Sequence, residues 1–333
     1  MIILCDMGGT HVRFAHIDKS RFAHITDLRF AHIDKSRFAH IDEKSEILNP
    51  QKLKIADYPS FDAALDDYLK GVGINRAEVS ELRMALGNRN PWSHLAEQTR
   101  ALCPQCRYSE INDFAANANG IALFPQSPLR VLRAGECEKV PPHATRVVIG
   151  PGTGTGLAYI LDTPHGPYVQ RTHGAHIAPA FLSTEHSELF AAVHTRRALS
   201  SQMIYEDILS GPGLWALYTE ILDRGTGITS PIYTDTYDLI LRGKNDEIAQ
   251  QSIRIFLEIF GSFAAQSVAY GYGYGGVYLT GGVTDVLMSA GSFDLRHFLK
   301  FYDLDYVPIV KAHVAATPIY WVDDPFIALK GLL

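Results

Sequence analysis

The sequence predicts an α/β protein built as two lobes. At 333 residues the chain is too long for one small core, and two domains are the natural expectation for this length. Patterns typical of strands and of helices are mixed along the chain, and this mixture occurs twice. A proline-marked stretch at residues 124–144 separates the two occurrences and indicates the passage into a second domain.

The composition is ordinary for a globular protein and argues against two classes of partner. Hydrophobic residues make up 47% of the chain and charged residues 20%. The 30 basic and 36 acidic residues give a net charge of −6, which argues against an electrostatic nucleic-acid binder. No apolar run approaches the roughly 20 residues that a membrane span requires. The N-terminal run Ile2–Cys5 is also too short for a signal peptide.

The four cysteines lack regular spacing, which suggests reduced thiols and a cytoplasmic location. Cys103 and Cys106 form a lone CxxC motif. A zinc site needs two further ligands, and only Cys137 and His143 lie at all close in the sequence. Metal binding by this motif is therefore the less favoured interpretation.

An eight-residue unit recurs four times near the N-terminus, starting at Arg13, Arg21, Arg29 and Arg37. An even period keeps equivalent residues on one face of a strand, yet neither face of this unit is cleanly apolar. Removing three copies leaves THVRFAHIDEKSEIL, a normal second strand that runs into a turn. We therefore interpret residues 19–42 as a tandem-repeat insertion in the second strand or its hairpin. A histidine-rich surface for a metal or a partner is the alternative.

The first half of the chain alternates strands with helices. A strand in LKIADY precedes a helix for which Ser60 is a good N-cap, Phe61 begins the apolar stripe and Gly71 or Gly73 marks the end. ELRMALGN then predicts a buried strand, SHLAEQTRAL a helix and RYSEI another strand. NDFAANANGIALF follows as a helix, with Asp113 well placed to cap it.

The second half begins with two strands, TRVVIG and GLAYIL, around a glycine loop and then becomes mainly helical. The pattern predicts helices near residues 185–198, 202–209, 214–223 and 246–271. The chain returns to strands at GGVYLTGG and TPIYWV and closes with a helix from about Pro325.

Three glycine-rich turns each follow an apolar strand, at residues 6–10, 150–156 and 280–282. Glycine lets a ligand approach the backbone, so that successive N–H groups can face an anion. One such turn is usually structural, but three of them, with Asp6 ending the first strand, favour phosphate binding. No G-x-x-x-x-G-K-[ST] motif occurs, which excludes a P-loop. The second turn runs into a strand rather than a helix, which argues against a Rossmann site.

Six segments of the chain resemble the bacterial-type ATP-dependent glucokinases of the hexokinase and actin-like fold superfamily. In the family's order they are DMGGTHVRFA, EINDFAANANGIAL, VVIGPGTGTGLA, SGPGLWALY, GGVYLTGG and TPIYWVDDPFIALKG. The resemblance implies a two-lobed actin-like/hexokinase (ribonuclease H-like) fold with a central ligand cleft. We expect a small α/β domain of residues 1–123 and 322–333, which carries the 19–42 insertion, and a large α/β domain of residues 124–321.

The resemblance also implies an activity and a catalytic residue. The activity is ATP-dependent phosphorylation of the 6-hydroxyl of glucose, with Mg²⁺ accompanying ATP. Asp113 would be the general base that takes the proton from the sugar hydroxyl, a step that suits a carboxylate. A plain helix cap is the alternative role for Asp113, and both roles can coexist. Asn112 beside it would hydrogen-bond the sugar.

The glycine turns would bind the nucleotide if the resemblance holds. The first two turns would hold the β- and γ-phosphates, and the third would let the adenosine half lie against the second lobe. Asp6 would orient Mg²⁺ through water, since Mg²⁺ keeps much of its hydration shell, and no residue is expected to bind the metal directly. The turn residues concerned are Gly8, Gly9, Thr10, Gly152, Thr153, Gly154, Gly281 and Gly282.

The sugar-binding segment departs from the family pattern. Similar glucokinases carry G-E-G-G-H where this chain has residues 172–176, so that His176 is kept but His173 replaces a carboxylate. A neutral imidazole has one acceptor, against about four lone-pair sites on a carboxylate. Each charge-assisted hydrogen bond lost in this way costs on the order of 1.5–3 kcal/mol. Glu206 matches the second sugar-binding acid of the family.

Two further departures concern the same predicted pocket. The hairpin that normally precedes a T-N-x-x-W segment is missing, and Asn88 or Asn90 stands in for the usual asparagine. His11 also replaces a common asparagine. Glucose is therefore the first expectation, and two alternatives stay open: another hexose or amino sugar, or a catalytically weak sugar-sensing or regulatory protein. The resemblance further suggests a homodimer.

Overall fold

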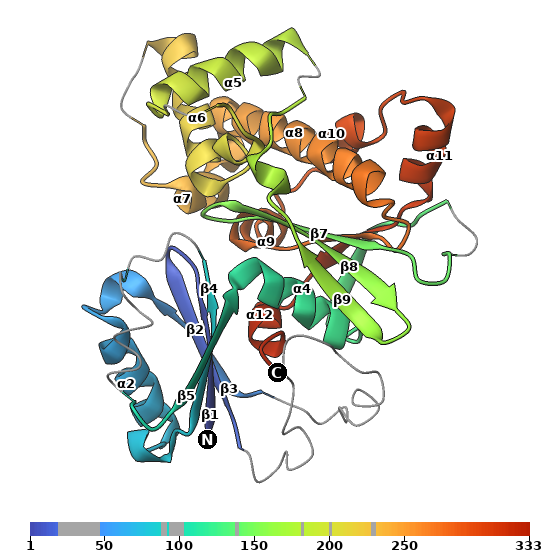
Figure 1. Cartoon of the computed structure of the whole chain (residues 1–333). Helices are drawn as coiled ribbons and strands as arrows, with labels where there is room; N and C mark the ends of the chain where they lie inside the picture. Colours follow the sequence, from blue (N-terminus) through green and yellow to red (C-terminus); the bar gives the residue numbers. More distant parts are fainter. Residues whose placement is uncertain are drawn as a thin grey trace. The chain divides into compact units, whose positions relative to one another are not determined.

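The computed structural model of the chain describes residues 1–18, 47–87, 92, 103–136, 140–180, 183–199, 202–227 and 231–333 (Figure 1). These residues fall into two compact units. Unit 1 comprises Met1–Ser127, Ile160–Gln170 and Asp324–Leu333, and unit 2 comprises Pro128–Tyr159 and Arg171–Asp323. The 19–42 insertion, the helix predicted at SHLAEQTRAL, and both Asn88 and Asn90 lie outside the described residues.

Unit 1 is organised around a five-stranded sheet. Its strands are β1 (Ile2–Met7), β2 (His11–Ile17), β3 (Leu48–Lys54), β4 (Glu81–Leu86) and β5 (Arg107–Asn112). The order across the sheet is β3-β2-β1-β4-β5. β1, β4 and β5 run parallel. On the other side of β1, β2 pairs antiparallel with β1, and β3 pairs antiparallel with β2. The predicted hairpin between β1 and β2 is confirmed.

Helices cover both faces of this sheet, which explains why every residue of β1 is buried (Figure 1). Ile3, Cys5 and Met7 pack on the side of α2, whereas Ile2 and Leu4 pack on the side of α4 and α12. α2 begins as predicted, because the Oγ atom of Ser60 accepts the N–H of Ala63 at 3.2 Å. The described residues of unit 1 form α2 (Phe61–Val72), α4 (Asp113–Leu123), α12 (Ile327–Lys330) and the short 3-10 helices Ile55–Asp57 and Arg76–Glu78.

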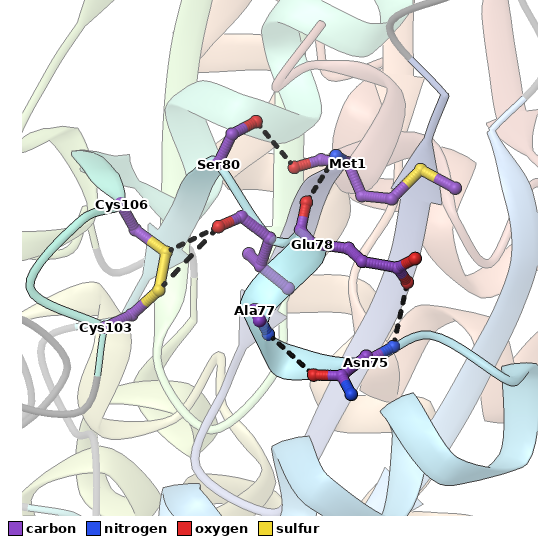
Figure 2. The surroundings of a disulfide bond; sticks show 8 residues. Met1, Asn75, Ala77, Glu78, Ser80, Cys103 and Cys106 are labelled. Carbon is purple, nitrogen blue, oxygen red and sulfur yellow. Dashed lines mark hydrogen bonds between the residues drawn. A yellow bond between two sulfur atoms is a disulfide. The ribbon is translucent and has the colours of Figure 1, made fainter.

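The N-terminal ends of the parallel strands are tied together (Figure 2). The amino group of Met1 donates to the carbonyl of Glu78 at 2.8 Å, and Ser80 Oγ donates to the carbonyl of Met1 at 3.0 Å. Just before β5, Cys103 and Cys106 form a disulfide, and the Sγ atom of Cys106 lies 3.2 Å from the carbonyl oxygen of Val79. The expectation of reduced thiols is therefore wrong for this CxxC pair.

A second sheet has six strands. They are β6 (Leu129–Arg133), β7 (Arg146–Pro151), β8 (Thr155–Thr163), β9 (Gly166–Arg171), β10 (Val277–Leu279) and β11 (Ile319–Val322). The order is β6-β11-β10-β7-β8-β9. β10 is parallel to both of its neighbours, and β6 is antiparallel to β11. β6 was not expected, because the prolines around it favoured a loop, and β9 was not predicted either.

The helices of unit 2 pack around α8, most of whose residues are buried. They are α5 (Thr184–Arg196), α6 (Gly211–Thr226), α7 (Thr236–Arg242), α8 (Glu247–Gly271), α9 (Gly282–Ser289), α10 (Leu295–Tyr302) and α11 (Pro308–Ala316), with 3-10 helices at Gly174–His176, Tyr205–Asp207 and Gly243–Asn245.

The predicted helices near 185–198, 214–223 and 246–271 are confirmed as α5, α6 and α8. The helix predicted over 202–209 is wrong, since this segment holds only the 3-10 turn Tyr205–Asp207. None of the helices in the described part of the chain is long and apolar enough to span a membrane.

Candidate functional site

The carboxyl ends of the three parallel strands in unit 1 bring two predicted site segments to one edge of the sheet. Met7 of β1 pairs with Leu86 of β4, and Leu86 pairs with Asn112 of β5. The residues that follow this paired row are Gly8, Gly87 and Asp113. The first glycine turn and the predicted base therefore follow the two strands, β1 and β5, that flank β4.

Asp113 is the first residue of α4, and the predicted cap needs correction. The N-cap is Asn112, whose Oδ1 atom accepts the N–H of Ala115 at 3.1 Å. The Oδ1 atom of Asp113 accepts the N–H of Phe114 at 2.8 Å and the Nδ2 group of Asn112 at 3.1 Å. Both polar atoms of the Asn112 amide are thus engaged within the chain: Oδ1 caps α4, and Nδ2, together with the N–H of Phe114, holds the Asp113 carboxylate in place.

The first glycine turn is a tight connection between β1 and β2. The N–H of Gly8 donates to the carbonyl of His11 at 3.1 Å, and the carbonyl of Thr10 accepts the N–H of Ile55 at 3.1 Å. The hydroxyl of Thr10, an exposed residue, lies 3.0 Å from Nδ1 of His11. The turn is therefore held by backbone bonds on both sides.

Positive charge surrounds this turn, and the sequence pattern did not reveal it. In the β2–β3 pairing, Lys54 lies opposite His11 and Lys52 lies opposite Arg13. Partial burial, together with these neighbouring positive charges, lowers the pKa of His11 to about 4. His11 is therefore neutral at pH 7, and the local field favours an anion at the turn.

Asp6 does not fit a direct ligand for Mg²⁺. Its Oδ2 atom accepts a hydrogen bond from Nη1 of Arg13 at 2.7 Å, and its side chain is only 7% exposed. Burial raises the pKa of Asp6, although the charge of Arg13 opposes this effect. Among the described residues no group of three or more His, Cys, Asp or Glu side chains is arranged to hold a metal ion.

The second glycine turn, Gly152–Gly154, connects β7 and β8 in unit 2. The N–H of Gly152 donates to the carbonyl of Gly154 at 2.7 Å, and the carbonyl of Gly152 accepts the N–H of Gly211 at 2.8 Å. Gly211 is the first residue of α6. The turn therefore lies at a helix N-terminus, where the helix dipole favours an anion.

The third glycine pair lies beside the same turn. Gly281 precedes the first residue of α9, Gly282, and a Cβ atom built on Gly152 would lie 3.8 Å from the backbone nitrogen of Gly282. Gly281 has φ of +94°, and any Cβ there would lie 2.6 Å from the carbonyl oxygen of Pro151. Only glycine suits this position, because both the backbone conformation and the space require it.

Glu206 connects the second turn with the predicted sugar segment. Its Oε2 atom accepts the N–H of Thr155 at 2.8 Å and lies 3.4 Å from Nε2 of His176. The rings of His173 and His176 stack, with centroids 5.7 Å apart and an angle of 25° between the planes. Unit 2 thus brings together the turn, Glu206 and both histidines.

Comparison with known proteins identifies the family of the chain. The sequence model of the glucokinase family matches residues 3–332. The chain belongs to the glucokinase family. The glucokinase of Cupriavidus pinatubonensis is 26% identical over 347 residues, which cover 99% of this chain and 90% of that protein. The glucokinase of Marinobacter nauticus is 28% identical, in an alignment that covers 98% of this chain and 94% of that protein.

Solved glucokinase structures share the fold of this family member. The glucokinase of Balamuthia mandrillaris, in complex with glucose, superposes with a TM-score of 0.73 at 18% identity over 99% of this chain and 92% of that one. A glucokinase from an Antarctic psychrotroph superposes with a TM-score of 0.67 at 22% identity, over 99% of this chain and 97% of that one. The predicted actin-like hexokinase fold is confirmed, and the chain is an enzyme, a hexose kinase.

Sequence reasoning missed several residues of this glucokinase-family site. Gly211 was part of the quoted SGPGL segment but had no role assigned, although a serine cap followed by glycine marks a helix N-terminus. Lys52 and Lys54 gave no signal, because only the β2–β3 pairing brings them to the first turn. Gly87 gave no signal either.

Proposed function

We propose that the chain is an ATP-dependent glucokinase that phosphorylates the 6-hydroxyl of glucose with Asp113 as the general base. The observation that carries the proposal is the position of the Asp113 carboxylate. It is fixed by two hydrogen bonds at the sheet edge where the first glycine turn begins. A base must be held rigidly near the reacting oxygen to be effective.

In the proposed reaction the 6-hydroxyl oxygen of the sugar attacks the γ-phosphorus of ATP. Asp113 takes the proton of that hydroxyl, the bond from the γ-phosphorus to its bridging oxygen breaks, and ADP leaves. Such a transfer requires positioning and charge stabilisation more than covalent chemistry. The hydrogen bonds from Asn112 and Phe114 orient the Asp113 carboxylate for this step.

In unit 1, we assign phosphate binding to Gly8, Gly9 and Thr10. The support is electrostatic, because Lys52 and Lys54 of β3 bring positive charge beside the turn, whereas the charge of Arg13 is paired with Asp6. Positive charge beside backbone N–H groups stabilises the negative charge of a transferring phosphoryl group.

In unit 2, we assign phosphate binding to the second turn and adenosine binding to the third. The N-termini of α6 and α9 both adjoin the second turn, which favours negative charge there. The residues concerned are Gly152, Thr153, Gly154, Gly281 and Gly282.

Mg²⁺ belongs to the proposal as a companion of ATP. When bound with the nucleotide it neutralises charge on the phosphates. Because Asp6 is already paired with Arg13, its role is limited to contact through water.

We assign hexose binding to Asn112, His173, His176 and Glu206, and to Asn90, which lies outside the described residues. The proximity of His176 to Glu206 supports a shared contact with a sugar hydroxyl. Because His173 stands where similar glucokinases carry a carboxylate, the second candidate is a kinase of the same fold for another hexose or an amino sugar. A catalytically weak sugar-sensing protein is the third.

A homodimer and a cytoplasmic location complete the proposal. Sedimentation of the purified protein measures whether it is a dimer.

The disulfide between Cys103 and Cys106 is compatible with a cytoplasmic location, because a CxxC disulfide inside a cell is usually reversible.

A coupled assay for ADP across a panel of hexoses tests the proposal. ADP release with glucose supports it, release only with another sugar favours the second candidate, and sugar binding without release favours the third. Asp113→Ala should lower kcat by about 10²–10⁴-fold with little change in ATP affinity. Asp305→Ala, at an exposed acid paired with Lys311, is the matched control. Substantial residual turnover in Asp113→Ala would remove Asp113 from the base role.

A further inference from the structure

Gly87, at the end of β4, adjoins the proposed base. Its N–H donates to the carbonyl of Met7 at 3.1 Å. A Cβ atom built on Gly87 would lie 2.7 Å from Oδ2 and 3.4 Å from Cγ of Asp113. The carboxylate therefore occupies the space that a side chain at position 87 would take.

The backbone at Gly87 gives no other reason for glycine. Its φ is not in the positive range that favours glycine, unlike that of Gly73 or Gly281. Among the described residues, the next nearest atom to a built Cβ is the carbonyl oxygen of Met7 at 3.5 Å, an ordinary contact. Alanine at this position would thus collide with one group, the carboxylate of Asp113.

The direction of the Asp113 side chain follows from this space. Gly87 lies between Gly8 and Asp113 in the row that follows the paired ends of the strands. Neighbouring strands are about 4.8 Å apart. Because the Asp113 carboxylate lies over Gly87, it lies over the end of β4, on the side of β5 that faces β1 and the first glycine turn.

We propose that Gly87 is a positioning residue for phosphoryl transfer: its missing side chain lets the Asp113 carboxylate lie over β4. This inference rests on the proposed function of Asp113. A side chain at position 87 would displace Oδ2 of Asp113 and so turn the carboxylate, whose Oδ1 accepts the hydrogen bonds from Phe114 and Asn112. Because the group displaced is the end of a short side chain, the fold would tolerate the change.

The test is Gly87→Ala, with Gly71→Ala as the matched control in the same unit. Gly71 lies in α2, where, among the residues that the structure describes, a Cβ atom would meet Nε2 of Gln51 alone, at an ordinary 3.8 Å. In Gly87→Ala we expect kcat to fall about 100-fold, the loss typical of a 1 Å misplacement. The KM values for ATP and hexose should stay within threefold, and the melting temperature should stay near that of the wild type.

Two outcomes overturn the inference. One is a kcat within threefold of the wild type, and the other is a loss explained by raised KM values. If Gly87→Ala is unstable, the double variant with Asp113→Ala decides, because removing the carboxylate should restore stability to that of Asp113→Ala alone. A double variant as unstable as Gly87→Ala contradicts the proposal. Failure of the proposed function is separate, since it appears as turnover in Asp113→Ala itself.

Discussion

Glu206 lies 3.4 Å from His176, measured from Oε2 to Nε2, and the same oxygen accepts the backbone N–H of Thr155. One carboxylate therefore contacts both the strand that leaves the second glycine turn and the predicted sugar segment. A Cβ atom at Gly154 would lie 2.6 Å from this oxygen, so the turn fits closely around the acid.

Because of this double contact, Glu206→Ala should weaken the binding of both substrates. Loss of a hydrogen bond to a charged group costs about 1.5–3 kcal/mol, which corresponds to a rise of about 10- to 100-fold in the KM for hexose. We expect the KM for ATP to rise as well. Glu206→Gln, which keeps one acceptor for Thr155, should preserve the KM for ATP better than the alanine variant. A rise in the KM for hexose alone, with the KM for ATP unchanged, would contradict a role of Glu206 at the second glycine turn.

His173→Glu should improve affinity for glucose, because it restores the carboxylate that similar glucokinases carry. Calorimetric titration with glucose measures the change, and about tenfold tighter binding is expected from one regained charged hydrogen bond. His165→Glu, at an exposed position in the β8–β9 turn, is the control for added charge. Weaker binding by His173→Glu would mean that His173 is adapted to a different sugar.

Deletion of residues 19–42 should leave activity and stability nearly unchanged. The first repeat copy supplies β2, in which Phe14 is fully buried and Nδ1 of His16 lies 2.9 Å from the hydroxyl of Tyr68. After the deletion seven residues (17, 18 and 43–47) still join His16 to Leu48, its partner in β3. Steady-state kinetics and thermal melting are the measurements. A large loss of activity or solubility would mean that the repeats form an interface.

Glu258→Gln should destabilise the protein by about 1.5–3 kcal/mol, because the substitution removes a buried carboxylate that accepts charge-assisted hydrogen bonds. Glu258 is 1% exposed and accepts hydrogen bonds from Arg254 at 3.0 Å and Lys300 at 3.2 Å, with His186 at 3.0 Å. Burial acts to raise the pKa of Glu258, but these partners outweigh it and lower the pKa to about 2.

The pH dependence of this effect has a definite sign. A carboxylate whose pKa is lower in the folded state stabilises above its unfolded pKa of about 4.5 and loses this contribution as the pH falls towards 2. The difference in unfolding free energy between wild type and Glu258→Gln should therefore shrink between pH 5 and pH 2. Urea titrations measure it, with the exposed Glu188→Gln as control. A constant difference across this range would contradict the assignment.

The sequence by itself determined the elements whose signals are local. Ser60 caps α2 as predicted, and the glycines after Met7 mark the turn between β1 and β2. These signals lie within a few residues of the structure they specify, because caps and turns are made by neighbouring backbone groups. Six segments in the family's order, among them the glycine turns, INDF and SGPGL, were also enough to indicate the family.

Only the tertiary structure decided which distant residues meet. It brought Lys52 and Lys54 to the first turn through the β2–β3 pairing. It also placed the Asp113 carboxylate over Gly87, 26 positions earlier in the chain. The physical reason is that strand pairing and side-chain collision depend on neighbours across the sheet, and no local pattern records which strand lies next to which.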